Sequence, residues 1–235
     1  MNSSVMVLLP AFNEEKNLDS VLSGIRYHLP GTRIVVVNDG SKDRTREILE
    51  GHPDVTALHH PFNLGIGGAI ETGFRYFLQT SSRFLLRIDA DGQHPPAEAK
   101  SLLGPLISGQ ADTVIGSRFL KKEGYQSSLT RRGGIKILNI LSAFILGQAI
   151  TDNTSGFKAY TRTAVESLIE DFPHDYPEPI EVYILSRKGM RIVEVPVRME
   201  ERREGLSSIS YIETYYYLIK VLLTILVKHM IGGKK

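Results

Sequence analysis

Short apolar runs alternate with longer segments of helical periodicity through the first half of the chain. The runs that predict strands are residues 5–9, 34–37, 55–58, 83–88 and 114–115. The segments that predict helices are 14–28, which has apolar residues three and four positions apart, a shorter one around 48–49, and 65–78. Strands and amphipathic helices in this alternation are typical of a mostly parallel α/β sheet that helices cover on both faces.

Polar clusters follow the predicted strands. They occupy residues 10–15, 38–43, 63–68, 89–93 and 116–118. The carboxyl ends of parallel strands lie at one edge of a sheet, and open α/β proteins bind their ligands there. We therefore expect these clusters to meet in one site.

Two segments of the second half, 135–150 and 211–231, are rich in Ile and Leu and have helical character. The first is shorter than the ~20 apolar residues that a membrane span needs, and charged residues interrupt the second. We expect amphipathic helices in the membrane interface, anchored by the tyrosines at 215–217; packing on the core or on a partner subunit is the alternative. The basic residues available for anionic headgroups are Arg131, Arg132, Lys136, Lys220, Lys228, Lys234 and Lys235.

We therefore expect one catalytic domain over residues 1–210, including an interface helix at 131–150, followed by an amphipathic helix and tail at 211–235. With 235 residues, 42% of them hydrophobic, the chain can bury a substantial core. The absence of cysteine excludes disulfides and thiolate metal sites, and a net charge of +2 without a dense basic stripe argues against nucleic acid. The first residues lack a basic n-region and a cleavage site, so we expect a location at the cytoplasmic face of the membrane.

The strongest candidate for chemistry is the pair of carboxylates that follows the apolar run 84–86. Asp89 and Asp91, with the amide oxygen of Gln93, suit a hard divalent cation, Mg²⁺ or Mn²⁺, that shares its shell with water and phosphate oxygens. The alternative is an ordinary turn, because Asp and Gly favour turns on their own account.

Two further clusters are consistent with a nucleotide. Asp39 follows the second strand, where an acidic side chain could take ribose hydroxyls or a base. Gly65, Gly67 and Gly68 remove side chains at the entry of a helix, so that backbone could approach a ligand. Tight packing of the helix on the sheet explains these glycines too, and for Gly68 the two explanations are equally good. Their spacing is not that of a P-loop.

Taken in order, the motifs at 10–15, 37–43, 63–68 and 89–93 resemble family 2 glycosyltransferases of the GT-A fold. The later motifs 116–118, 152–160 and 191–197 are similar to the polyprenyl-phosphate branch, which includes dolichol-phosphate mannose synthases. The resemblance extends from Val5 to about Ser210. It implies a GT-A (Rossmann-like) fold and inverting, metal-dependent transfer of a hexose from a GDP- or UDP-sugar to a polyprenyl phosphate at the membrane surface.

The resemblance also implies roles for individual residues. Metal binding is expected of Asp89, Asp91 and Gln93, and catalysis of Asp91 and Arg118. The residues expected to bind the nucleotide sugar are Pro10, Phe12, Glu14, Asp39, Gly67, Asp89, Arg202 and Arg203. Those expected to hold the acceptor phosphate, through the planar fork of arginine, are Arg118, Arg131 and Arg132.

The chemistry of the acceptor also favours a phosphate. A hydroxyl acceptor needs a general base, and many relatives that use one carry a Gln-x-x-Arg-Trp motif, whereas this chain has no tryptophan. A phosphate monoester, with a second pKa near ~6, is already a dianion at neutral pH and needs cations instead.

Two departures from the branch keep alternatives open. Ser208 stands near a position that usually holds lysine, and 176–181 is rich in proline. Glu178, Glu181 or Asp152 could be the base for a sugar hydroxyl, although a proline-stiffened structural loop explains 176–181 equally well. A non-catalytic nucleotide-binding subunit docked on a membrane protein is the alternative of another class. A separate small membrane protein could also hold the enzyme at the bilayer.

Overall fold

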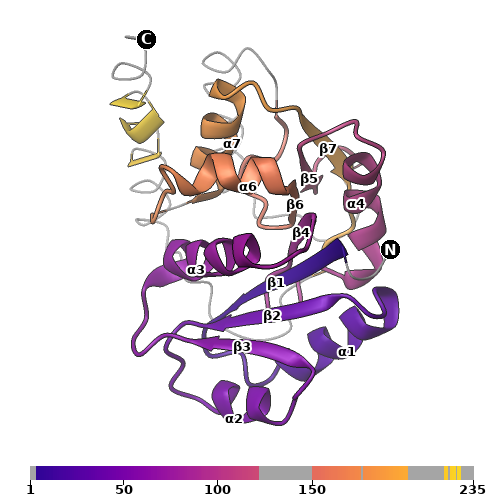
Figure 1. The fold of residues 1–235 in the computed structure, drawn as a ribbon, viewed down its shortest axis with the longest axis vertical. Coiled ribbons are helices and arrows are strands. Elements are labelled where there is room, and N and C mark those ends of the chain that lie inside the picture. Colours follow the sequence, from indigo (N-terminus) through magenta and orange to yellow (C-terminus); the bar gives the residue numbers. More distant parts are fainter. Residues whose placement is uncertain are drawn as a thin grey trace.

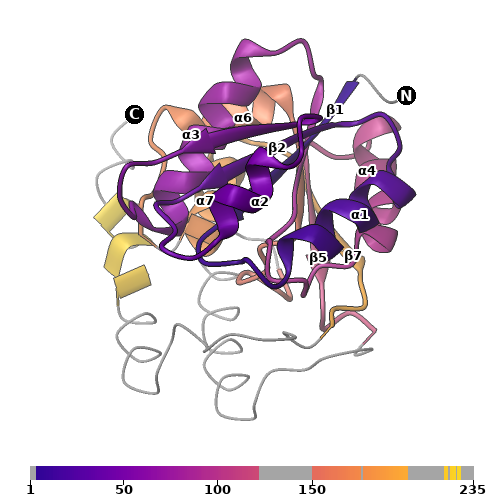
Figure 2. The ribbon, with the colours of Figure 1, turned by 90° about the horizontal axis from the view of Figure 1, so that it is seen from below.

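The computed structural model describes residues 4–121, 150–175, 177–200, 220–221, 223–225 and 227–228. These residues form one sheet with helices on both faces (Figures 1 and 2). The strands are β1 Val5–Ala11, β2 Arg33–Asn38, β3 Val55–His59, β4 Phe84–Arg87, β5 Thr113–Ser117, β6 Lys158–Thr161 and β7 Ile192–Pro196. The helices are α1 Leu18–His28, α2 Thr45–Glu50, α3 Gly65–Gln79, α4 Ala99–Ile107, α6 Arg162–Ile169 and α7 Pro177–Arg187, with a short 3-10 turn η2 at Pro96–Glu98.

The sheet has the strand order β3-β2-β1-β4-β6-β5-β7. Strand β6 is antiparallel to both of its neighbours, whereas the other described pairs are parallel. The mostly parallel sheet predicted from the sequence is thus confirmed. The chain winds outward from β1 to β2 and β3 and then returns to β4 on the other side of β1, which places a ligand crevice between the carboxyl ends of β1 and β4.

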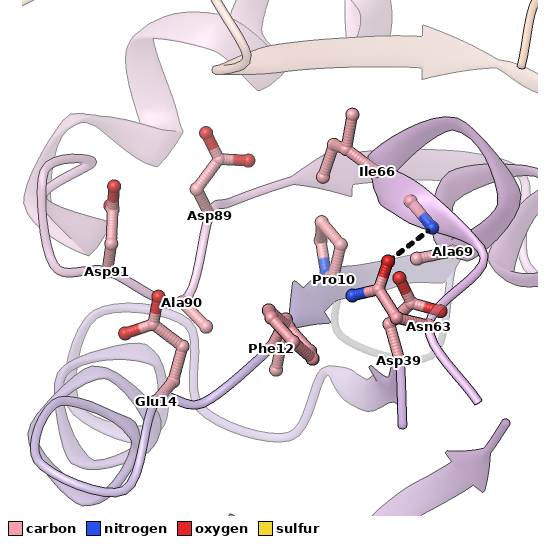
Figure 3. A pocket seen from close by; sticks show the side chains of 12 residues that line it. Pro10, Phe12, Glu14, Asp39, Asn63, Ile66, Ala69, Asp89, Ala90 and Asp91 are labelled. Atoms are coloured by element: carbon pink, nitrogen blue, oxygen red, sulfur yellow. Dashed lines mark hydrogen bonds between the residues drawn. The ribbon is translucent and has the colours of Figure 1, made fainter. Parts of the chain in front are cut away.

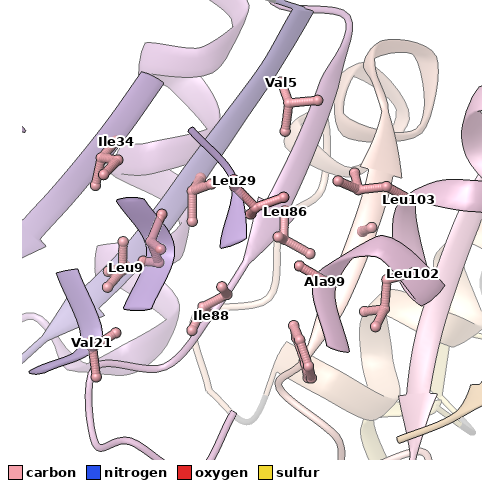
Figure 4. Close-up of a cluster of buried hydrophobic side chains, with 14 of the residues drawn as sticks. Val5, Leu9, Val21, Leu29, Ile34, Leu86, Ile88, Ala99, Leu102 and Leu103 are labelled. Atoms are coloured by element: carbon pink, nitrogen blue, oxygen red, sulfur yellow. The ribbon is translucent and has the colours of Figure 1, made fainter. Parts of the chain in front are cut away.

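Two hydrophobic cores, one on each face, follow from the alternation of side chains along the strands. In β1, Val5, Val7 and Leu9 face the core beneath α1 and α4 (Figure 4), whereas Met6 and Leu8 face the core beneath α3, α6 and α7. All five are buried, and each buried aliphatic side chain stabilises the fold by roughly 1.5–3 kcal/mol. The central strand is therefore fixed from both faces, and with it the crevice at its end.

Two predicted elements need correction. The helix predicted from residue 14 begins at Leu18, because the carbonyl of Glu14 accepts hydrogen bonds from the amides of Asn17 and Leu18 and closes a turn first. The proline-stiffened loop considered as an alternative for 176–181 is, from Pro177 on, the beginning of helix α7. Prolines in the first turn of a helix have no N–H to leave unpaired, so Pro177 and Pro179 are compatible with helix there.

The described residues between 220 and 228 are helical, and they pack on the domain. Val221 and Ile225 are buried in the core beneath α3, α6 and α7. The ammonium groups of Lys220 and Lys228 pair with Asp175 and Asp171 at the surface, and their expected role toward lipid headgroups stays a prediction. Core packing, the alternative considered for this segment, holds for these residues.

The predicted helix at 131–150, apart from Ile150, and the tyrosines at 215–217 lie outside the described residues. Within the described part of the chain, no helix combines the length and the hydrophobicity needed to cross a bilayer.

Candidate active site

A cavity of about 500 Å³ opens at the carboxyl edge of the sheet, between the ends of β1 and β4 (Figure 3). It is lined by Pro10, Ala11, Phe12, Glu14, Asp39, Asn63, Gly65, Ile66, Ala69, Asp89, Ala90 and Asp91. Four of the predicted polar clusters therefore meet here, as the positions of the strands require. Figure 3 shows Glu14, Asp89 and Asp91 toward one side of the cavity and Asp39 and Asn63 toward the other.

The acidic side is built on the loop that follows β4. Gly92 makes the turn with φ 79°, a conformation that favours glycine, and the amide of Gln93 donates to Asp91 Oδ1 over 3.0 Å. Asp91 is 5% exposed, whereas the Asp89 side chain is 34% exposed to the cavity. Gln93 follows in the same loop but does not line the cavity.

The carboxylates of this loop suit a divalent cation whose coordination shell is completed by a substrate. The described residues contain no group of three or more His, Cys, Asp or Glu side chains able to hold a metal by themselves. Two neighbouring carboxylates are, however, the protein ligands that Mg²⁺ and Mn²⁺ commonly use when phosphate oxygens and waters complete the shell. Asp89 and Asp91 fit such an ion, and Gln93 remains a predicted ligand.

The opposite side of the cavity combines apolar surface with a buried carboxylate. Pro10 and Phe12 stand at the end of β1, and Phe12 is 42% exposed although it is aromatic. Asp39 is buried, and its Oδ1 accepts hydrogen bonds from the amide of Leu64 at 2.8 Å and from His60 Nδ1 at 2.7 Å. Both bonds use one oxygen, so Asp39 is held in a fixed orientation at the cavity wall.

His60 was not among the predicted site residues. Its Nε2 lies 2.9 Å from Thr72 Oγ1 of α3, so the ring links Asp39 to that helix. The signal was available in the sequence, because His60 directly follows the strand-forming run 55–58 and its neighbour His59. Ile66 and Ala69, which also line the cavity, were missed because apolar residues in a helix are expected to pack in the hydrophobic core.

The cavity wall that contains Glu14 is hydrogen-bonded to the loop before α2 and to the first residue of that helix. Asn13 donates its amide to Ser41 Oγ, Glu14 to Thr45 Oγ1 and Glu15 to Asp43 Oδ2, at 2.8–3.0 Å. The loops that follow β1 and β2 thus form one unit, which places Glu14 at the cavity.

Asp43 also supports the start of α2. Its Oδ1 accepts from the amide of Thr45, the first residue of the helix, although the N-cap position itself is Arg44. Burial raises the pKa of Asp43, but the hydrogen bonds from Thr45 and Glu15 outweigh burial and lower it below the ordinary value.

The glycines at the entry of α3 have different roles. Gly65 lines the cavity and has φ 83°, a conformation that favours glycine, and backbone approach to a ligand there stays a prediction. The prediction for Gly67 needs correction. A Cβ at Gly67 would lie 2.0 Å from the carbonyl oxygen of His174, so packing of the 174 segment explains this glycine. At Gly68 a Cβ would meet the side chain of Leu64 at 2.7 Å, which also indicates packing.

Arg118 follows β5, and Asp152 holds its guanidinium. Arg118 Nε and Nη2 each donate to a different oxygen of Asp152 at 2.7 Å, and Nη2 also donates to Thr154 Oγ1. The Asp152 side chain is fully buried and that of Arg118 is 11% exposed. This pairing fixes the guanidinium of Arg118, which was predicted to bind phosphate. It also engages both carboxylate oxygens of Asp152, one of the candidate bases.

Glu194 of β7 secures the same loop from behind. Its carboxylate accepts from the amide and hydroxyl of Thr151 and from the amide of Asp152, at 2.8–2.9 Å. Burial raises the pKa of Glu194. The motifs at 116–118, 152–160 and 191–197 therefore meet around one residue, Arg118.

Glu181 is a structural residue in a buried charged cluster. One carboxylate oxygen accepts from Arg87 Nη1 at 3.0 Å; the other accepts from Lys158 Nζ at 2.9 Å and from the hydroxyl of Tyr160 at 2.8 Å. Burial alone would raise the pKa of Glu181, but Arg87 and Lys158 outweigh burial and lower it. With both oxygens engaged and no exposure, Glu181 does not have the position of a base for an acceptor hydroxyl.

Glu178 lies at the edge of this cluster. Its carboxylate is 3.5 Å from Arg87 Nη2, and its backbone carbonyl accepts from Lys158 Nζ. Burial raises the pKa of Glu178. Glu178 does not line the cavity described above.

Arg131, Arg132, Arg202, Arg203 and Ser208 lie outside the described residues, so their predicted roles stay predictions.

Comparisons with known proteins agree with the motifs. The profile described as Glycosyl transferase family 2 matches residues 6–169. The polyprenol monophosphomannose synthase of Mycolicibacterium smegmatis is 33% identical over 214 residues, which cover 87% of this chain and 80% of that protein. The UDP-N-acetylglucosamine–dolichyl-phosphate N-acetylglucosaminyltransferase of Methanococcus voltae is 30% identical over 213 residues, which cover 83% of this chain and 84% of that protein.

The structure is also similar to that of glucosyl-3-phosphoglycerate synthase from Mycobacterium tuberculosis in complex with Mn²⁺, UDP and phosphoglyceric acid. The TM-score is 0.72 at 23% identity, over 97% of this chain and 78% of that one. At this level of identity the likeness concerns the fold.

Proposed function

The chain belongs to glycosyl transferase family 2 and is a glycosyltransferase with the GT-A fold, and on that premise we propose that it moves a hexose from a nucleoside-diphosphate sugar to a polyprenyl phosphate. The observation that carries the proposal is that one cavity is lined by Asp89 and Asp91 as well as by Asp39 and Phe12. One ligand can reach both sides, and a nucleotide sugar has the matching parts, a diphosphate and a nucleoside.

The nucleoside is assigned to the side of Pro10, Phe12 and Asp39. The exposed face of Phe12 offers apolar contact to a base. Asp39 Oδ1 is already engaged by Leu64 and His60, so Oδ2 is the oxygen assigned to the ribose hydroxyls or the base. Both GDP and UDP satisfy these contacts. An assay of transfer from GDP- and UDP-sugars therefore identifies the donor.

The diphosphate is assigned to the side of Asp89 and Asp91. Two carboxylates and a diphosphate repel one another unless a cation lies between them. A bound Mg²⁺ or Mn²⁺ would neutralise the charge that develops on the leaving diphosphate. Asp89 and Asp91 would hold this ion, with Gln93 as the third predicted ligand.

A phosphate acceptor agrees with the carboxylates of the site. Glu181 and Asp152, two of the three candidate bases, form ion pairs with arginine side chains. A phosphate dianion needs no base. Its oxygen would attack the anomeric carbon from the side opposite the diphosphate, which inverts the configuration. Arg118, held by Asp152, is assigned to the acceptor phosphate, together with Arg131 and Arg132.

The names of the relatives support this acceptor. The mycobacterial and methanococcal relatives are named for polyprenol and dolichyl-phosphate chemistry, respectively, and they differ in the sugar. We assign the enzyme to the cytoplasmic face of the membrane, where such a lipid presents its phosphate. A small membrane protein remains the proposed means of holding it there.

The donor site is tested by Asp91→Asn, which removes one charge and keeps the shape of the side chain. We expect transfer to fall by at least ~100-fold, because the outgoing charge loses its stabilisation, while the thermal unfolding temperature stays within a few degrees. Glu98→Gln, at a carboxylate on η2 that does not line the cavity, is the matched control and should keep normal activity. Near-normal transfer by Asp91→Asn would show that the metal assignment is wrong.

A further inference from the structure

His94 follows the acidic loop and is buried beside it. It is 4% exposed, and its ring stacks on the fully buried Phe157, with centroids 4.9 Å apart and planes 11° apart. Phe157 directly precedes β6, and its carbonyl accepts the amide of Gly116 in β5. The His94 ring is therefore packed against a residue that the sheet holds in place.

The ring meets the backbone of Asp89. The ladder between β1 and β4 pairs Leu8 with Arg87, and the last amide bonded to β1 is that of Ile88, which donates to the carbonyl of Leu8. The next amide, that of Asp89, donates instead to His94 Nδ1 at 3.0 Å. A buried amide without an acceptor is costly, and His94 supplies one at the point where the strand ends.

The same hydrogen bond defines the state of the ring. Because the Asp89 amide donates, Nδ1 carries the lone pair and the proton resides on Nε2. The 3.6 Å separation between Nδ1 and Asp89 Oδ2 is accordingly not an ion pair.

The Asp89 carboxylate is bounded on another side by backbone. A Cβ at Gly156 would lie 2.6 Å from Asp89 Oδ2, so only glycine leaves room for the carboxylate there. Gly156 is held in turn by Arg87 Nε, which donates to its carbonyl at 2.7 Å. Asp89 thus has its amide fixed by His94 and its carboxylate limited by Gly156.

We propose that His94 is a positioning residue, which fixes the backbone of Asp89 so that its carboxylate is aimed at a divalent cation. The proposal rests on the proposed function, because it concerns the ion assigned to Asp89 and Asp91. Outer groups that orient metal ligands typically change metal affinity or activity by ~10–100-fold when they are removed. A residue that merely filled space would change stability and leave metal affinity unaltered.

Two substitutions separate the hydrogen bond from the packing. His94→Phe keeps an aromatic ring against Phe157 but removes the acceptor. His94→Asn gives up the stacking but can present its Oδ1 near the place of Nδ1. We expect His94→Phe to raise the Mn²⁺ concentration for half-maximal transfer by ~10-fold or more, with a smaller change in kcat at saturating Mn²⁺. His94→Asn should restore a Mn²⁺ requirement close to that of the unsubstituted enzyme.

A measurement without metal or nucleotide provides a second readout. In the unsubstituted protein, nitrogen-15 NMR should show the Nε2–H tautomer of His94, and the Asp89 amide should be protected from hydrogen exchange. That protection should fall in His94→Phe and return in His94→Asn. Because the tautomer is measured on the unsubstituted chain, this part of the test holds even if a variant fails to fold.

The outcomes distinguish this proposal from the proposed function. If the unsubstituted protein binds Mn²⁺ with nucleotide and His94→Phe binds it equally well, the positioning role is overturned and the metal site stands. A proton on Nδ1 in the resting protein would overturn the positioning role as well. If the unsubstituted protein itself shows no metal-dependent nucleotide binding, the proposed metal site fails first, and the positioning role fails with it.

Discussion

At the scale of single residues, the charged cluster around Glu181 shows that this candidate base stabilises the fold. Arg87 and Lys158 are both fully buried, and Glu181 pairs with both of them between β4, β6 and α7, while Glu178 supplies a second negative charge beside Arg87. Removing one partner of a buried ion pair leaves uncompensated charge, which typically costs about 3–5 kcal/mol.

Glu181→Ala should therefore lower the free energy of unfolding by about 3–5 kcal/mol in urea titrations. A base for an acceptor hydroxyl would behave differently, since its loss would leave a stable but inactive enzyme. A Glu181→Ala protein of normal stability that had lost transfer would return Glu181 to the list of candidate bases.

Gly67 gives a second prediction at this scale. Gly67→Ala would place a Cβ 2.0 Å from the His174 carbonyl oxygen, so backbone must move, and overpacking of this kind costs about 1–3 kcal/mol. Gly104→Ala is the matched control, because it lies in α4 with nothing within 4 Å of its Cβ and should gain up to ~1 kcal/mol from helix propensity. Thermal unfolding should move in opposite directions for the two variants, and equal shifts would contradict the packing role of Gly67.

Residues that face the cavity with their own side chains could be predicted from the sequence. Residues whose role depends on a contact with a distant partner could not. Asp39 and Asp89 were predicted from their places after strands and Phe12 from the family resemblance, and all three line the cavity. The role of Glu181 could not be predicted, because Lys158 lies 23 residues before it and a buried lysine has no periodic signature. His94 was missed for a related reason, since its partner is a backbone amide, which every residue carries.

At the scale of elements, the loop before α2 determines how the cavity wall is held. Asp43 joins the amide of Glu15 to the first turn of α2, and its hydrogen bonds lower its pKa below the ordinary value of 3.8. A carboxylate with a lowered pKa in the folded state stabilises the fold above its unfolded pKa, and this contribution is lost as the pH falls through the folded value.

We therefore expect Asp43→Asn to be less stable than the unsubstituted protein at pH 7, by an amount that shrinks as the pH falls below about 4. The measurement is the urea midpoint of both proteins from pH 7 to pH 3. A difference that stays constant over this range would show that the charge of Asp43 does not contribute.

Elements were predicted well where the hydrophobic pattern was long and uninterrupted. Helix α3 was predicted within one residue, because its apolar stripe runs from the glycine entry to its end. Strand β6 was not predicted, since it has four residues and contains Lys158. The helix α7 was not predicted, and a loop was considered in its place, because Pro177 and Pro179 indicate a break unless they are known to lie in a first turn.

At the scale of the whole molecule, the strand order explains why distant motifs form one site. Asp39 and Asp89 stand 50 positions apart in the chain, yet both follow strands that flank β1, and both line the same cavity. The site on the acceptor side is assembled differently, because β6 runs against its neighbours and brings 152–156 back beside Arg118 and Asp89. That return could not be predicted from local pattern, since it depends on an unpredicted strand.

As proposed, this molecule transfers sugar to a lipid phosphate with the help of a divalent cation. The most direct test is transfer of radiolabelled sugar from a panel of UDP- and GDP-sugars, with Mn²⁺ or Mg²⁺, to short-chain polyprenyl phosphate. Polyprenol without phosphate is the matched acceptor, and EDTA provides the control without metal. We expect label in the organic phase from one donor, only with the phosphorylated lipid, and lost with EDTA. Equal labelling of the alcohol, transfer that survives EDTA, or no labelled lipid from any donor would contradict the account.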